Sequence, residues 1–173
     1  TQQSLLLDSR SNISWNLNST GFTLVDDGSG VDQVVYSYSV RDDQLGGDYY
    51  DVYVGIDGDS FLVKEDARSA YISEVADLGQ GIYAVAWSEQ SDGYTDDNGQ
   101  WVDSRRDAHV QFFDADSQAM GDELVLDDAG AIQYVDQLSI DANASGDLVV
   151  YADGSGINGG RTLSLWKIDQ ETQ

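Results

Sequence analysis

Apolar and polar residues alternate with a period of two along much of the chain, which is the pattern of half-buried β-strands. One alternating run occurs three times, each time after a turn that contains Gly or Asp. The three copies are Val34–Ser39, Ile82–Ser88 and Leu148–Ala152. After a polar loop, each copy is followed by a second alternating run that ends in Asp, at 51–57, 108–114 and 163–169. No stretch of ten or more residues has apolar positions at helical spacing, so the sequence predicts an all-β fold.

The repeats continue with a short apolar strand, at 60–63 in the first copy and 123–126 in the second. The third copy lacks this strand, and a matching one, Ser4–Leu7, is found at the N-terminus. The segment 13–24 then leads into the next turn, as 70–78 and 132–140 do elsewhere. The sequence therefore predicts one domain, 1–173, of three four-stranded antiparallel units at 34–81, 82–147 and 148–173 plus 1–33.

A repeat with four short strands per unit is typical of propeller-like or β-prism-like architectures, in which each unit buries its faces against its neighbours. We expect the N-terminal strands, residues 4–24, to close the structure by pairing with the C-terminal strands, because closure removes an unpaired sheet edge. The pairing can form within one chain or between copies. In the second case the chain is its own partner, in a ring or a filament.

The net charge is −24, from 32 acidic and 8 basic residues. Such a charge repels phosphate groups, so we expect neither nucleic acid nor an anionic membrane as a partner. Two interpretations remain: a solvated acidic surface suited to a saline setting, or specific calcium sites built from Asp-rich turns. The candidate calcium ligands are Asp26, Asp27 and Asp32; Asp92, Asp96, Asp97 and Asn98; and Asp141, Asn143 and Asp147.

The second unit carries a recognisable motif. A Gly hairpin feeds a strand that ends in Trp, at 78–87, and it is followed by Gln111–Asp116 and Gly121–Leu126. This pattern resembles the tandem propeller-type repeats of large bacterial secreted and surface proteins, including calcium-associated adhesins. The chain departs from that pattern at Ser117, where the family usually has Gly, and at Tyr38 and Ala152, which replace the strand-end Trp. The resemblance implies an extracellular or cell-surface β-rich module and no particular activity.

The second unit also has a longer loop, 91–107, than the corresponding loops of the other two units. Aromatic rings that stack on a pyranose and polar groups that bind its hydroxyls are suited to sugar recognition, so one interpretation is a glycan site. The alternative is that Trp101 packs against the domain or a neighbouring subunit. The candidate ligand-binding residues are Tyr94, Trp101, Arg105 and Arg106.

The residues give little support for catalysis. The only histidine, His109, lies on an alternating strand where we expect a structural role, and the chain has no cysteine. We therefore expect a non-enzymatic adhesive or ligand-binding module, stabilised by calcium. The alternatives are a structural subunit assembled by strand exchange and, third, a glycosidase or lyase of propeller type.

Overall fold

The computed structural model describes residues 17–26, 32–41, 48–91, 94–95, 99, 101–102, 105–126, 134–156 and 160–169. Within these residues the chain forms thirteen strands and no helix, which confirms the predicted all-β class. The strands are β1 Leu17–Asp26, β2 Asp32–Arg41, β3 Tyr49–Ile56, β4 Asp59–Arg68, β5 Ser73–Gly79, β6 Ile82–Gln90, β7 Tyr94–Thr95, β8 Trp101–Val102, β9 Arg106–Phe113, β10 Ala119–Leu126, β11 Tyr134–Ala142, β12 Leu148–Ser155 and β13 Arg161–Ile168.

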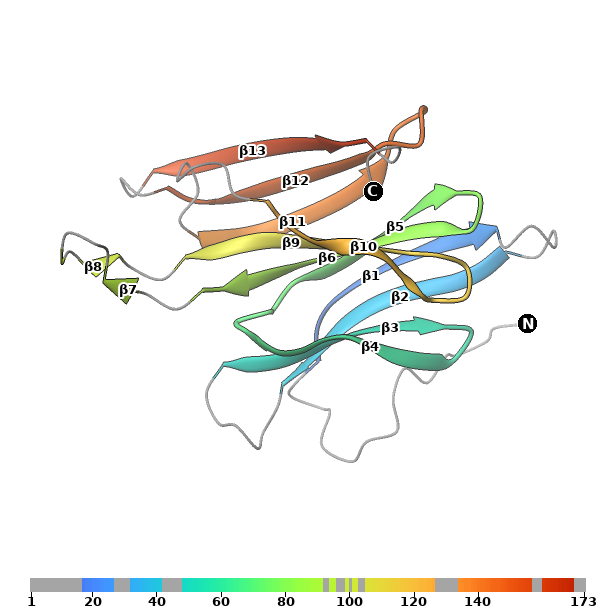
Figure 1. Ribbon diagram of the computed structural model, residues 1–173, viewed down its shortest axis with the longest axis horizontal. Helices are drawn as coiled ribbons and strands as arrows, with labels where there is room; N and C mark the ends of the chain where they lie inside the picture. Colours follow the sequence, from blue (N-terminus) through green and yellow to red (C-terminus); the bar gives the residue numbers. More distant parts are fainter. Residues whose placement is uncertain are drawn as a thin grey trace.

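The strands form three consecutive antiparallel units that lie one above another in Figure 1. The first unit is the four-stranded sheet β1-β2-β3-β4. The second comprises β5, β6, β9 and β10, with the small β7–β8 hairpin between β6 and β9, and the third comprises β11, β12 and β13. The second and third units share one sheet through a single parallel pair, Tyr134 with Arg106. Radial closure into a propeller or prism remains a prediction.

The predicted start of each unit was wrong by one strand. We expected residues 4–24 to pair with the C-terminal strands, but the described part of this segment lies in β1, which pairs with β2 from Leu17↔Val40 to Asp26↔Asp32. A strand that enters a tight turn pairs with the strand that leaves it, and β5 and β11 likewise pair with β6 and β12. The units therefore begin at residues 17, 73 and 134. The expected N-terminal strand 4–7 lies outside the described residues, and pairing between chains remains a prediction.

The middle unit is buried on both faces. On β6, the side chains of Tyr83, Val85 and Trp87 pack into one core with the first unit. The alternate residues Ala84 and Ala86 pack into a second core with the third unit. Strands buried on both faces lose the alternation of apolar and polar residues, which explains why 82–87 is apolar throughout.

The first strands of the three units lie beside one another, with β5 between β1 and β11. Gly21 on β1 permits the closest approach. A Cβ atom at this position would lie 2.8 Å from both the Cα of Glu74 and the backbone nitrogen of Val75 on β5. Because these neighbours are backbone atoms, they cannot move aside as a flexible side chain could, so a side chain at Gly21 would push the two strands apart.

We predict that Gly21→Ala lowers the free energy of unfolding by about 1–3 kcal/mol, the usual cost of overpacking a close contact. Urea unfolding followed by intrinsic fluorescence measures this change. Gly160→Ala is the matched control, because nothing lies within 4 Å of a Cβ atom at that position. Equal stabilities of the two variants would contradict the close approach of β1 and β5.

Candidate functional site

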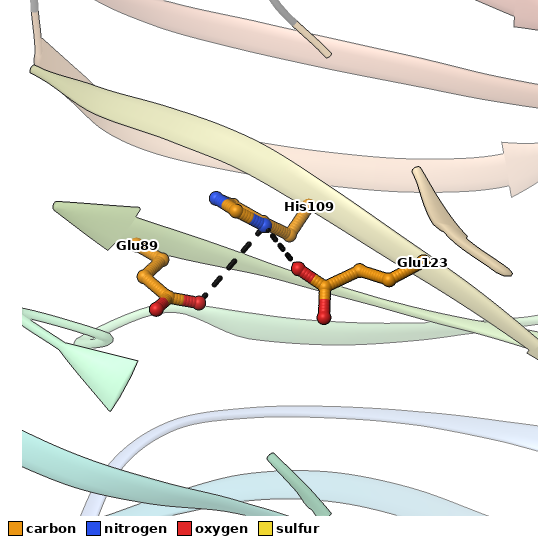
Figure 2. Close-up of side chains that lie close together, drawn as sticks. All are labelled: Glu89, His109 and Glu123. Carbon is orange, nitrogen blue, oxygen red and sulfur yellow. Dashed lines mark hydrogen bonds and ion pairs between the residues drawn. The ribbon is translucent and has the colours of Figure 1, made fainter. Parts of the chain in front are cut away.

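A cluster of charged side chains lies where the first unit meets the second, on the side of the second unit that faces β4. Glu89 comes from β6, His109 from β9 and Glu123 from β10, and Figure 2 shows the three converging. The Nδ1 atom of His109 lies 2.7 Å from Oε1 of Glu123 and 3.9 Å from Oε2 of Glu89. Because an ionised carboxylate only accepts hydrogen bonds, Nδ1 of His109 carries the proton that is donated to Glu123.

Lys64 of β4 completes the cluster from the opposite unit. Its Nζ atom donates to Oε2 of Glu123 at 3.0 Å and lies 3.6 Å from Oε2 of Glu89. Burial acts to lower the pKa of Lys64, but the hydrogen bond to Glu123 and the charge of Glu89 outweigh burial and raise it. Burial likewise acts to raise the pKa of Glu123, whereas hydrogen bonds from His109 and Lys64 lower it overall. The cluster is thus an ionic link between the two units.

The position of His109 within the repeat explains its packing. Its ring stacks on Trp87, its cross-strand neighbour, with centroids 5.6 Å apart and planes at 22°. In the first unit the equivalent pair, Tyr38 and Tyr53, stacks in the same way, at 5.4 Å and 15°. The predicted structural role of His109 is therefore consistent with the geometry, and its contact with Glu123 is an addition to that role.

The same three side chains form a donor set for a metal ion. The ligand atoms of Glu89, His109 and Glu123 all lie within 4.8 Å of one another. One imidazole and two carboxylates suit Zn²⁺ and similar transition metals better than Ca²⁺, which prefers oxygen ligands. Nζ of Lys64 already pairs with both carboxylates, so an entering cation would compete with it for them. The geometry is therefore best described as an ion-pair cluster in which the chain supplies its own cation.

We predict that Glu123→Gln destabilises the fold by about 1 kcal/mol at pH 7, because it removes the charge from a partly buried and hydrogen-bonded carboxylate. The folded-state pKa of Glu123 lies below the ordinary value of 4.5. The stabilisation is thus present above pH 4.5 and is lost as the pH falls through the folded-state pKa. Urea unfolding of wild type and variant between pH 3 and pH 7 should show the difference shrinking below pH 4.5.

The control is Glu65→Gln, the same chemical change at an exposed position of β4. This variant should match wild type within about 0.5 kcal/mol. A Glu123→Gln variant as stable as Glu65→Gln at neutral pH would show that the cluster contributes nothing to joining the units.

The structure brings some of the predicted calcium ligands together and leaves others outside its described part. Asn143 and Asp147 meet in the β11–β12 turn, where Oδ1 of Asn143 accepts from the backbone nitrogens of Ser145 and Asp147. The Asp147 carboxylate accepts from Nδ2 of Asn143 and from Nζ of Lys167, at 2.8 and 2.7 Å. Local hydrogen bonds thus already occupy these two side chains. Asp141, also predicted, is exposed, and its carboxylate accepts from the backbone nitrogen of Ala142.

The other two predicted calcium groups are described only in part. Asp26 and Asp32 are paired residues at the end of the β1–β2 hairpin, and their side chains are outside the description. The remaining predicted ligands, Asp27, Asp92, Asp96, Asp97 and Asn98, also lie outside the described residues. Calcium binding at these groups stays a prediction.

The predicted glycan site is similarly divided. Tyr94 pairs with Val102 and Trp101 with Thr95 in the β7–β8 hairpin, but the structure does not describe their side chains. The guanidinium of Arg106 lies over the ring of Tyr71, 4.7 Å from its centroid, and 6.0 Å from that of Tyr134. Arg106 also donates to the backbone oxygen of Val135. The contacts with Tyr134 and Val135 join the second unit to the third, and together with the contact to Tyr71 they favour a packing role for Arg106.

Arg105, the fourth residue predicted for the glycan site, lies at the base of the 91–107 loop. Its backbone oxygen accepts from the backbone nitrogen of Ser91 at 2.7 Å, which closes the loop. Its guanidinium lies 3.7 Å from the carboxylate of Asp107. These contacts hold the two ends of the loop together, and sugar recognition by the loop stays a prediction.

The two ends of the stack of units expose apolar side chains. We call the face of β1–β4 that points away from the second unit the front face, and the corresponding face of β11–β13 the rear face. The front face exposes Phe22, Leu24 and Val34, whereas Tyr36 and Tyr38 on the same face are buried. The rear face exposes Tyr151, Leu163 and Leu165. Leu62 of β4 is also exposed on the front face, as the cross-strand partner of Tyr53. Val125, at the equivalent place on β10, is exposed on the side of the second unit that faces the first.

The sequence analysis missed the ionic cluster and both end faces. Glu89 and His109 are 20 positions apart and His109 and Glu123 are 14 apart, and only the register of β6, β9 and β10 brings them together. The signal for the end faces was present, because Leu163 and Leu165 are apolar residues on alternate positions of a strand. Their exposure could not be recognised without knowing which unit lacks a neighbour.

Comparison with known proteins finds no family model, no curated protein and no solved structure that matches the chain. The resemblance to adhesin repeats therefore remains a prediction. A search of the described strands and turns finds no helix long and apolar enough to cross a membrane.

Proposed function

We propose that this chain is a non-enzymatic binding module that acts through the two end faces of its stacked β-units. The observation that carries the proposal is the distribution of exposed apolar side chains. Of the eight large ones among the described residues, seven lie on the front and rear faces. Exposed apolar groups gathered on one surface are typical of interaction sites, whereas scattered ones are not.

The acidic composition supports an extracellular or cell-surface setting for this module. A net charge of −24 favours solvation at high ionic strength and attracts divalent cations. We include calcium stabilisation and glycan recognition by the 91–107 loop in the proposal, on the strength of the Asp-rich turns and of the aromatic residues in that loop.

The apolar faces can be tested with Nile red, a neutral dye that fluoresces on exposed apolar surface. Phe22→Gln with Leu24→Gln, or Leu163→Gln with Leu165→Gln, should each reduce dye binding at micromolar protein. Val125→Gln, at an exposed apolar position outside both faces, should reduce it less. A wild-type protein that binds no dye, or that hydrolyses a panel of chromogenic glycosides, would contradict a non-enzymatic module that binds through these faces.

We predict that salt and calcium raise the melting temperature. Screening by 0.5 M sodium chloride should stabilise the fold because 32 acidic groups repel one another at low ionic strength. Differential scanning fluorimetry in chelator, in millimolar calcium and in sodium chloride separates the two effects. A melting temperature that rises with sodium chloride and does not respond to calcium would rule out specific calcium sites.

A further inference from the structure

The carboxylates and the imidazole of the ionic cluster belong to one unit, whereas their cation belongs to another. Glu89, His109 and Glu123 come from β6, β9 and β10 of the second unit, and the register of these strands brings them together (Figure 2). Lys64 comes from β4 of the first unit. The second unit therefore carries a complete donor set, and only the cation is supplied from outside that unit.

Trp87 of β6 fixes two of the three donor side chains. Its ring stacks on the imidazole of His109, with centroids 5.6 Å apart, and its Nε1 atom donates to Oε2 of Glu89 at 3.1 Å. Trp87 is 1% exposed and lies in the core shared with the first unit, so its own position is fixed by packing. Outer contacts of this kind, which hold ligand side chains in place, are characteristic of metal sites in proteins.

The separations of the ligand atoms suit a small ion. Nδ1 of His109 lies 2.7 Å from Oε1 of Glu123 and 3.9 Å from Oε2 of Glu89. Around a tetrahedral Zn²⁺ with bonds of about 2.0–2.1 Å, neighbouring ligand atoms lie about 3.3 Å apart. Each separation thus has to change by about 0.6 Å, which small rotations about the side-chain bonds of the two glutamates can provide.

Lys64 is a cation that can be exchanged. Its side chain is 30% exposed, and its Nζ atom lies 3.0 Å from Glu123 and 3.6 Å from Glu89. A partly exposed ion pair contributes little, because solvent screens the charges and a long side chain has to be ordered. A transition-metal ion would instead form a coordinate bond to each of the three donors. Glu89 and Glu123 are partly exposed as well, so an ion can enter from solvent.

We propose that Glu89, His109 and Glu123 form a binding site for a divalent transition-metal ion such as Zn²⁺, and that the ion replaces Lys64. Nδ1 of His109 and one oxygen of each carboxylate are the protein ligands. Coordination requires the proton on Nδ1 to leave, and the neutral ring then carries its proton on Nε2. The ion exchanges a link between two units for a link among three strands of one unit. The site lies between units, so it is independent of the proposed function of the end faces.

Isothermal titration calorimetry of the untagged protein with zinc chloride at pH 7 tests the site. We expect one tight site per chain, weakened by about tenfold or more in Glu89→Gln and in Glu123→Gln, each with unchanged circular dichroism. Glu65→Gln makes the same change in charge at an exposed position of β4 and should bind as wild type does. Equal losses in all three variants would show that the acidic surface as a whole attracts the zinc, and would overturn the site.

The exchange with Lys64 is tested by removing the competing cation. Lys64→Met should bind Zn²⁺ about fivefold more tightly, the factor that corresponds to one partly exposed ion pair. Lys167→Met is the matched control, because it makes the same change in charge at the ion pair with Asp147 on another part of the domain. A Lys64→Met variant that binds no more tightly than Lys167→Met would contradict the exchange.

NMR of His109 reports the coordination directly in the wild-type protein, because it is the only histidine of the chain. In long-range ¹H–¹⁵N spectra, saturating Zn²⁺ should shift the Nδ1 resonance and leave the proton on Nε2. Calcium at the same concentration should change neither nitrogen, because Ca²⁺ takes oxygen ligands. An imidazole that does not respond to Zn²⁺, or that coordinates it through Nε2, would overturn the proposal.

Discussion

The burial of both faces of the middle unit is the constraint on which the rest of the structure depends. In its inner strand β6, larger side chains point to one face and small ones to the other. Tyr83, Val85 and Trp87 face the first unit, and the small residues Ala84 and Ala86 face the third. Protein interiors are packed as densely as organic crystals, so such a strand requires a neighbour of complementary shape on each side. The first unit supplies this neighbour, since Val35, Val52 and Val54 are fully buried in one core with the three large side chains of β6.

The sequence was sufficient to predict the all-β class and the position of most strands, because period-two alternation follows directly from strand geometry. The expected run 82–88, for example, lies within β6, Ile82–Gln90. The start of each unit could not be predicted in the same way. A repeat reveals its period, but any point along the period can serve as the beginning, and only the pairing of β1 with β2 resolved the choice.

The candidate calcium sites were harder to predict, because Asp and Asn occur in turns for more than one physical reason. Asp-rich turns suggested calcium, yet the structure shows that several acidic side chains hold the turns by accepting backbone hydrogen bonds. Oδ1 of Asp114 accepts from the nitrogens of Asp116 and Gln118, and Oδ1 of Asp77 accepts from that of Gly79. Such local bonding is a general reason for Asp and Asn in turns. Ser117 adopts a left-handed φ of 62° in the Asp114 turn. Gly adopts this conformation at little cost, which gives a physical reason for Gly at this point of the repeats that the second unit resembles.

The pairing of small against large side chains between units has a consequence for how this sequence can change. Ala84 and Ala86 share a core with Leu148 and Val150 of the third unit. A larger residue on the β6 side would need a smaller one on β12, because the backbone spacing is shared by the whole stack. Substitutions at these positions should therefore be inherited in compensating pairs. In an alignment of relatives, residue volumes on facing strands of adjacent units should covary inversely, even where the individual residues are poorly conserved.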